Sequence, residues 1–404
     1  MGFEFNSYSA ILLLPFSQAV LFGMLLICKT GDRFKLSNLL LGVILLLIGV
    51  RIAYWMLGFA GWYDSHDAFT SFMFYFPFNT TCLIGPLIYF YFLSATNQDF
   101  RFEKKHSYHL LLPILWLVII VGKIALDYML YFPFPKTLNS QFGTKGPLAE
   151  VDKTLLFTLV SYGSLTYYLV LTYKLFGAYR QYAIENLSSL ENLDFAWLRN
   201  ILLAMGSGLI LMFTYQIINW INPLTYKAEW YSYMLLGILV YYLGIKGYMF
   251  QGSNKPALYF TNGLQVEDGQ SNEAKGFPDL ARRMKELDQL LDQRKPYLIA
   301  DLTLSQLASM MGLNSSILSR VINMGHNLNF NDFINAYRIR EVISRIDNQQ
   351  HKKVTLLGIA LDSGFNSKAT FNRAFKKQTG KTPLEYIKNL ESQRKLVSNY
   401  DLER

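Results

Sequence analysis

Residues 302–323 read LTLSQLASMMGLNSSILSRVIN, and the spacing of their apolar side chains predicts two short helices joined by a tight turn. Thr303 followed by Gln306 forms a capping box that starts the first helix. Gly312 can end this helix in a left-handed conformation, and Asn314 can cap the second one. The segment is therefore predicted to be a helix-turn-helix, whose second helix can enter a major groove.

The same pattern returns at residues 355–377, where Gly364 again marks the turn and Ser367 caps the following helix. Residues 330–346 lie between the two units and are predicted to form one long helix. A final helix is expected to begin at Thr382, with a proline at its first position and a glutamate closing a capping box. Two units in tandem are a more specific signal than one, because any small helical hairpin can imitate a lone unit.

The positive charge of the chain is concentrated in this same part. The chain holds 38 Lys and Arg against 29 Asp and Glu. Residues 294–395 alone hold 16 basic and 7 acidic side chains, a local charge of +9 that equals the net charge of the chain. A basic domain of this kind is expected to bind a polyanion.

Three stretches carry a resemblance to a known family: 359–367 (IALDSGFNS), 371–377 (FNRAFKK) and 380–386 (GKTPLEY). They resemble the C-terminal DNA-binding domain of AraC-family transcription regulators, over about residues 295–390. The first helix-turn-helix departs from the family at Ile322-Asn323, where Phe and Lys are usual. The resemblance implies two recognition helices that enter consecutive major-groove segments, about 34 Å apart.

The resemblance also implies which side chains contact DNA. Arginine can bind guanine and asparagine can bind adenine through two hydrogen bonds each, while lysines on the next turn suit phosphates. For Arg320 a backbone contact or a structural pair is an equal alternative. The base-facing candidates are Ser316, Ser319 and Arg320 in the first helix and Lys368, Ala369, Asn372 and Arg373 in the second, and the phosphate candidates are Lys376 and Lys377.

The first 250 residues are of a different kind. The whole chain is 51% apolar and 17% charged, against about 25% charged residues in an ordinary soluble domain. Apolar runs of 20 residues or more are long enough to cross the roughly 30 Å hydrocarbon core of a bilayer. Seven such runs occur, at 9–28, 37–60, 70–94, 108–131, 154–173, 200–221 and 230–250. Small residues at 206–208 are expected to allow close helix contact.

The predicted fold is therefore all-α, with a seven-helix transmembrane bundle followed by a cytoplasmic tandem helix-turn-helix domain. The domains are expected at residues 1–250 and 279–395, joined by a polar cytoplasmic linker at 251–278. Residues 279–295 read as an amphipathic helix that packs on the domain after it, or alternatively forms a short dimer contact or a signal-transmitting helix. Eleven Lys and Arg on one side of the spans against four on the other predict an outer N terminus and a C-terminal domain in the cytoplasm of a bacterium.

Polar residues in the outer halves of the spans are candidates for a ligand site, because an ionisable residue in a span is costly and should face the interior with a partner. In one interpretation Arg51, with Lys123, presents positive charge to an anionic or polar ligand. In the other, Arg51 pairs with Asp127 or reaches the outer interface, and Lys123 and Asp127 neutralise each other. The candidates are Arg51, Asn79, Lys123, Asp127, Gln216 and Asn219.

The function expected from these patterns is a membrane-embedded one-component transcription regulator. Cys28 and Cys82 support neither a disulfide nor a metal site, and no catalytic motif, cofactor motif or His ligand spacing is present in the sequence. The alternatives are a transporter or membrane enzyme with a regulatory tail, and a constitutive membrane-tethered DNA-binding protein. The expected partners are double-stranded DNA, the lipid bilayer, RNA polymerase, a small-molecule or membrane signal, and a second copy of the chain.

Overall fold

The computed structural model describes residues 4–29, 35–97, 100–132, 145–151, 154–190, 193, 195–249 and 279–402. These residues form helices and contain no strand, and the expected linker at 251–278 lies outside them. The chain divides into two compact units, which are described separately. The first unit holds Met1–Gly177 and Phe195–Thr261, and the second holds Ala178–Asp194 and Asn262–Arg404. The segment Ala178–Asp194 was expected in the domain at 1–250 but belongs to the second unit.

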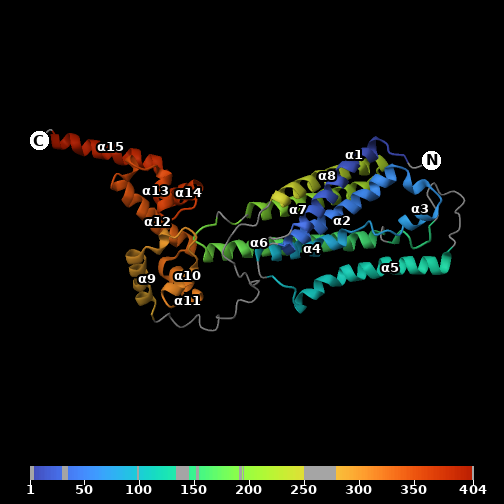
Figure 1. Ribbon diagram of the computed structural model, residues 1–404, viewed down its shortest axis with the longest axis horizontal. Helices are drawn as coiled ribbons and strands as arrows, with labels where there is room; N and C mark the ends of the chain where they lie inside the picture. The colour runs from blue at the N-terminus through green and yellow to red at the C-terminus, as the bar shows by residue number, and fades with distance from the viewer. Residues whose placement is uncertain are drawn as a thin grey trace. The chain divides into compact units, whose positions relative to one another are not determined.

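Long apolar helices dominate the described part of the first unit (Figure 1). Five are long and apolar enough to cross a membrane, namely α1, α2, α5 with the turn before it, α6 and α7. The seven-span count therefore stays a prediction, since α4 is shorter and α8 is not among these five. The helices are α1 (Ser7–Cys28), α2 (Lys35–Phe59), α3 (Ala68–Met73), α4 (Thr81–Thr96), α5 (Leu111–Tyr131), α6 (Leu155–Asn186), α7 (Phe195–Ile221) and α8 (Tyr226–Met249).

The apolar run at 70–94, expected to form one span, is divided between two helices, because α3 ends at Met73 and α4 begins only at Thr81. Pro77 lies in the break, where its ring removes a backbone donor and disfavours helical geometry in the residue before it. The exposed backbone is partly satisfied by neighbouring helices, since Trp116 Nε1 donates to the carbonyl of Asn79 at 3.0 Å. The break thereby places Asn79 beside α5 instead of inside a helix.

Close packing in this unit depends on glycines of α1, α2 and α8. A Cβ on Gly42 would lie 2.7 Å from the carbonyl oxygen of Gly23, and a Cβ on Gly237 would lie 2.8 Å from Pro15 Cβ. The glycines at 206 and 208 do not bring two helices into close contact as expected, because a Cβ on Gly206 would meet nothing within 4 Å and a Cβ on Gly208 would meet only the side chain of Leu239 at 3.8 Å. Helix contact therefore follows the glycines of the first, second and last long helices of the unit.

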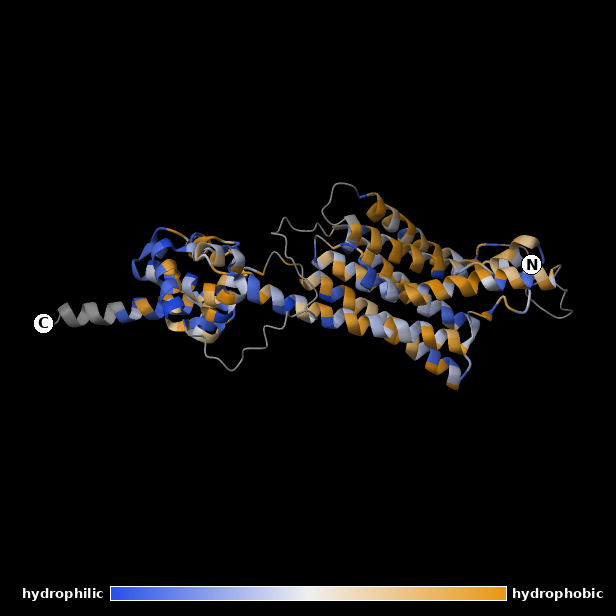
Figure 2. Ribbon diagram, turned by 90° about the horizontal axis from the view of Figure 1, so that it is seen from below, coloured by the Kyte–Doolittle hydropathy of each residue, from blue (hydrophilic) through white to orange (hydrophobic). Residues whose placement is uncertain are grey.

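Many apolar side chains of the first unit are exposed. The ribbon of this unit is largely orange in Figure 2, which marks hydrophobic residues. Leu14 of α1 is 58% exposed, Val118 of α5 is 60% exposed and Ile210 of α7 is 68% exposed. Exposed apolar patches of this extent are typical of a surface that a lipid or a partner covers.

The second unit is built around one long helix, α12 (Phe330–Asp347), which joins two hydrophobic cores. Its first half packs Phe333 and Tyr337 into the core of the first helix-turn-helix, and its second half packs Val342 and Ile346 into the core of the second. The other helices are α9 (Leu280–Arg294), α10 (Leu304–Met310), α11 (Ser315–His326), α13 (Leu356–Asp362), α14 (Lys368–Thr379) and α15 (Pro383–Leu402).

The local signals of the second unit are confirmed. The side chain of Thr303 caps α10 together with Gln306, and Gly312 and Gly364 have φ values of 65° and 93°. The amphipathic helix α9 packs on the domain that follows, because Leu287 belongs to the first core. The packing alternative for residues 279–295 is thus the one observed.

Candidate nucleic-acid interface and ligand cavity

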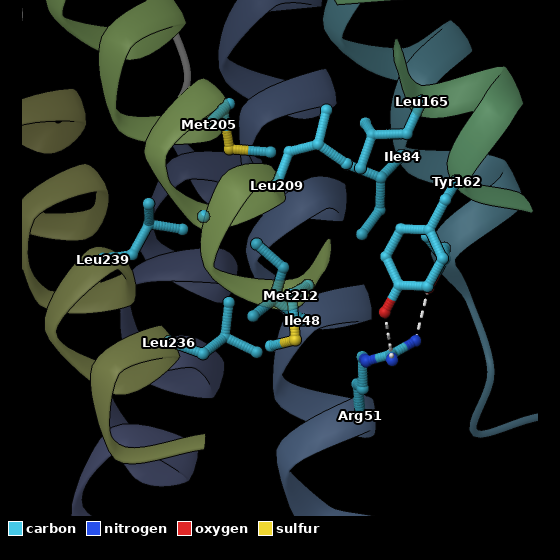
Figure 3. Close-up of a pocket in the computed structure, with 12 residues that line it drawn as sticks. Ile48, Arg51, Ile84, Tyr162, Leu165, Met205, Leu209, Met212, Leu236 and Leu239 are labelled. Atoms are coloured by element: carbon cyan, nitrogen blue, oxygen red, sulfur yellow. Dashed lines mark hydrogen bonds between the residues drawn. The ribbon is translucent and has the colours of Figure 1, made fainter. Parts of the chain in front are cut away.

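Arg51 lies on α2 and is half-buried. It donates to Asn79 Oδ1 at 3.1 Å and to the hydroxyl of Thr81. It also donates to the hydroxyl of Tyr162 at 3.4 Å (Figure 3). The alternative in which Arg51 pairs with Asp127 is wrong, because Arg51 donates to neutral side chains while Asp127 accepts from Tyr75 and from the backbone of Leu148. The break between α3 and α4 supplies Asn79, and Thr81 is the first residue of α4.

Arg51 lines two cavities of the first unit. One has a volume of about 60 Å³ and is mostly apolar, with Ile84, Leu165 and Met205 among its walls (Figure 3). The other has a volume of about 340 Å³ and is lined by both polar and aromatic side chains. Its lining includes Arg51, Asn79, Thr158, Gln216 and Glu229 together with Tyr54, Trp55, Phe74, Phe76, Phe78 and Tyr233.

Lys123 and Asp127 lie elsewhere in the unit. Asp127 is fully buried and accepts hydrogen bonds from Tyr75 at 2.7 Å and from the backbone of Leu148 at 2.9 Å. Lys123 donates to the carbonyl of Ala149 at 3.1 Å. These two side chains therefore hold the turn at residues 147–150 and do not line either cavity of Arg51.

The structure brings together only part of the predicted ligand set. Arg51, Asn79 and Gln216 line the larger cavity. Asn219 does not, because its Oδ1 accepts from the backbone of Leu224 at 2.9 Å and so closes the chain after α7. Sequence reasoning missed Glu229, which was counted as a residue outside the span that follows it. Tyr233, four residues later on α8, lines the same cavity, so helical spacing could have drawn attention to that face.

The first recognition helix, α11, is amphipathic for a simple reason. Asn314 caps it by accepting from the backbone of Ser316 at 2.9 Å, which fixes the register in which Leu318, Val321 and Ile322 are fully buried. Ser316 and Arg320 are exposed on the opposite face, while Ser319 is half-buried. The outer face of α11 thus carries one charged candidate, Arg320.

The second recognition helix, α14, has a more basic outer face. The side chain of Ser367 caps it, and Phe371 and Phe375 are buried in the second core. The remaining candidates are all exposed, namely Lys368, Ala369, Asn372, Arg373, Lys376 and Lys377. Their contact with DNA remains a prediction, and their exposure is what such contact requires.

Residues 307–389 match the family model of a helix-turn-helix domain. Residues 307–389 are an AraC-type helix-turn-helix domain. An uncharacterized HTH-type transcriptional regulator of Staphylococcus aureus strain COL is 33% identical over 100 residues, and a relative from strain MSSA476 has the same identity over the same length. Each match covers 25% of this chain and 13% of the relative, so the chain spans only about an eighth of these proteins. No solved structure matches the chain.

Ion pairs tie the AraC-type domain together around α12. Lys377 Nζ lies 2.8 Å from Asp332 Oδ1, so a phosphate would have to compete with this carboxylate for Lys377. Burial would raise the pKa of Glu341, but hydrogen bonds from Lys295 and Arg345 outweigh that effect and hold the pKa below its usual value. Within the described residues, no group of three His, Cys, Asp or Glu side chains could hold a metal ion.

Proposed function

We propose that this protein is a membrane-embedded one-component transcription regulator of bacteria, in which the apolar helices bind a signal and the AraC-type domain binds specific DNA. The observation that carries the proposal is the cavity of about 340 Å³ around Arg51 in a chain that also has a helix-turn-helix domain. The names of the relatives, HTH-type transcriptional regulators, support regulation of transcription over catalysis. The DNA-binding residues, RNA polymerase and a second copy of the chain as partners belong to the same proposal.

The chemistry of the cavity indicates the kind of signal. Arg51 supplies a cation whose hydrogen-bond partners are neutral, while Asn79 and Gln216 supply amides that can both donate and accept. Aromatic rings such as those of Trp55 and Tyr233 supply apolar surface. Glu229 also lines the cavity, and its carboxylate disfavours a ligand that places a negative charge beside it. A small anionic or polar molecule with an apolar part suits this lining.

The sensing role is tested in cells with the full chain and a transcription reporter. Conditions that change expression of genes near the bound DNA sites are found first, and the response is then measured for Arg51→Gln. We expect Arg51→Gln to abolish the response while the protein level in the membrane, and the DNA occupancy in the absence of the signal, stay as in the wild type. Ile210→Ala, at an exposed apolar position, is the matched control. A normal response of Arg51→Gln would favour a constitutive tether.

The DNA-binding role is tested by crosslinking the full chain to the chromosome and sequencing the bound DNA. Arg373→Ala should relax the base preference at one position, at a cost of about 1–3 kcal/mol, because arginine would contact a base edge. Lys376→Ala should weaken binding to all DNA sequences alike and lower the salt dependence of the affinity. Uniform weakening by Arg373→Ala would show that Arg373 contacts phosphate.

The orientation is tested with reporters fused to the chain. The proposal places the N terminus outside the bacterial cytoplasmic membrane and the DNA-binding domain in the cytoplasm, where the chromosome is accessible. A reporter protein fused after Lys255 should be active if it is of a kind that works in the cytoplasm and inactive if it is of a kind that works only in the periplasm. Activity of a periplasmic reporter at this position would overturn both the orientation and the regulator proposal, because the domain could not reach DNA.

A further inference from the structure

Residues 187–190, here named the 187–190 loop, connect α6 to the segment before α7 and belong to the second unit. Ser188 is fully buried, and Leu187 and Ser189 are less than a tenth exposed. Leu187 forms an antiparallel bridge with Thr303, and the backbone of Ser188 donates to the carbonyl of Leu302 at 3.1 Å. The loop therefore packs on the first helix-turn-helix at the residue that caps α10.

Arg338 of α12 is hydrogen-bonded to the loop. The side chain is 1% exposed, and its guanidinium donates to the carbonyl of Ser188 at 3.2 Å and to the Ser188 hydroxyl at 3.0 Å. It also donates to the carbonyls of Tyr297 at 2.8 Å, Ile299 at 2.8 Å and Ala300 at 3.1 Å. Burial lowers the pKa of Arg338 to about 10, against the effect of nearby Asp301, so the side chain stays charged at neutral pH. The loop supplies part of the hydrogen bonding that a buried cation needs.

The loop also contacts the second helix-turn-helix. Asn331 of α12 donates to the carbonyls of Leu187 at 3.1 Å and Ser188 at 3.0 Å. Asn366, the residue before the cap of α14, donates to the hydroxyl of Ser189 at 3.0 Å and to Asp301 Oδ1 at 2.7 Å. The loop thus bonds to the start of α10, to α12 and to the turn of the second helix-turn-helix at the same time.

Contacts on both sides of a junction fix the two sides relative to each other. The loop lies at the junction of the two helix-turn-helix units, and their recognition helices must match two major-groove segments in spacing and angle. With the loop in place, Arg320, Asn372 and Arg373 remain exposed. The docked loop therefore leaves the candidate DNA-contacting faces open, and it favours binding by holding them in one arrangement.

We propose that the 187–190 loop is the coupling element of this protein: it holds the two helix-turn-helix units at one spacing, and the apolar helices control DNA binding by pulling the loop out or letting it dock. The chain itself makes the connection, because the loop continues into α6 on one side and leads to α7 on the other. The regulatory half of this inference rests on the proposed function, whereas the effect on spacing does not.

The test uses the full chain in lipid nanodiscs and a DNA duplex recovered from the crosslinking experiment. Ser188→Lys places a second cation beside Arg338 and should undock the loop. We expect it to lower affinity for the native duplex about tenfold, which corresponds to about 1.4 kcal/mol. A base pair inserted between the two segments should weaken the wild type about tenfold but Ser188→Lys only about twofold, because the undocked units adjust their spacing. Gln181→Lys, at an exposed position of α6, is the control and should behave as the wild type.

A milder pair of variants guards against misfolding of Ser188→Lys. Ser189→Ala and Asn366→Ala each remove one partner of a single loop contact, and their effects on affinity should be non-additive if that contact acts. Unchanged affinity and spacing preference in Ser188→Lys, or additive effects of the milder pair, would overturn the coupling role. Failure of the proposed function gives a different pattern, in which Arg51→Gln responds normally while Ser188→Lys still alters the spacing preference.

Discussion

Arg51 of α2 and Arg338 of α12 are both enclosed by helices, but their partners differ in kind. Arg338 donates mainly to backbone carbonyls of fixed segments, including those of Tyr297 and Ser188. Arg51 donates to side-chain oxygens such as that of Asn79 and lines two cavities. An arginine saturated by backbone groups holds segments together, whereas one that shares movable side chains with a cavity can exchange those partners for a ligand.

The largest effect is expected from Arg338→Gln. The shorter amide cannot reach the carbonyls at residues 188, 297, 299 and 300, and each buried acceptor without a donor is costly. We expect the second unit to lose about 3 kcal/mol or more of stability. Native-state hydrogen exchange of α12 amides in the full chain measures this loss. A change below about 1 kcal/mol would show that Arg338 does not hold the segments together.

Gly364→Ala should have the next largest effect, and it separates the shape of the Arg338 site from its charge. A Cβ at this position would lie 2.4 Å from the carbonyl oxygen of Tyr297 and 2.9 Å from Arg338 Nε, and Gly364 has a φ of 93°. We expect a loss of about 2 kcal/mol, seen as faster exchange in both α12 and α14. Gly312→Ala is the matched control, since its φ of 65° is also positive but a Cβ there meets nothing within 4 Å. Equal losses in the two variants would assign the cost to backbone conformation alone.

Arg51→Gln applies the same substitution to the other arginine and should change stability least of the three. The shorter glutamine loses the hydrogen bonds to Asn79 and Thr81 as well, but these two residues line cavities in which water can replace the lost donor. We expect a loss of stability of less than about 1 kcal/mol, measured by hydrogen exchange of α2, although the transcriptional response is lost. A loss as large as that of Arg338→Gln would contradict the comparison and make Arg51 a structural residue.

A smaller and pH-dependent effect is expected at Glu341, three residues after Arg338 on α12. Its pKa lies below the ordinary 4.5 in the folded protein, so the stability it contributes is present above that value and is lost as the pH falls through the lower, folded value. Glu341→Gln should therefore be less stable than the wild type at pH 7, and the difference should shrink below about pH 4.5. Urea unfolding of the full chain at the two pH values measures it. A difference that is independent of pH would exclude the ion pairs with Lys295 and Arg345 as its source.

Local sequence signals predicted the DNA-binding part well. The caps at Thr303, Asn314 and Ser367 and the turns at Gly312 and Gly364 are decided within a few residues, so the sequence shows them directly. At residues 70–94 the sequence did not decide the outcome, because an apolar run with a proline reads alike whether the proline bends the helix or ends it. The helix ends here because neighbouring helices satisfy part of the exposed backbone.

The sequence alone determined the helical character of the chain, the tandem helix-turn-helix and the polar residues that have to be accommodated among apolar helices, because these follow from periodicity, capping and the cost of burying charge. Only the tertiary structure decided the partners of those residues: Asp127 with Tyr75, Arg51 with Asn79, and Arg338 with Ser188, which lies 150 positions away. Pairings between distant segments depend on how helices meet, and a hydrophobic pattern specifies which face of a helix is buried but not which neighbour covers it.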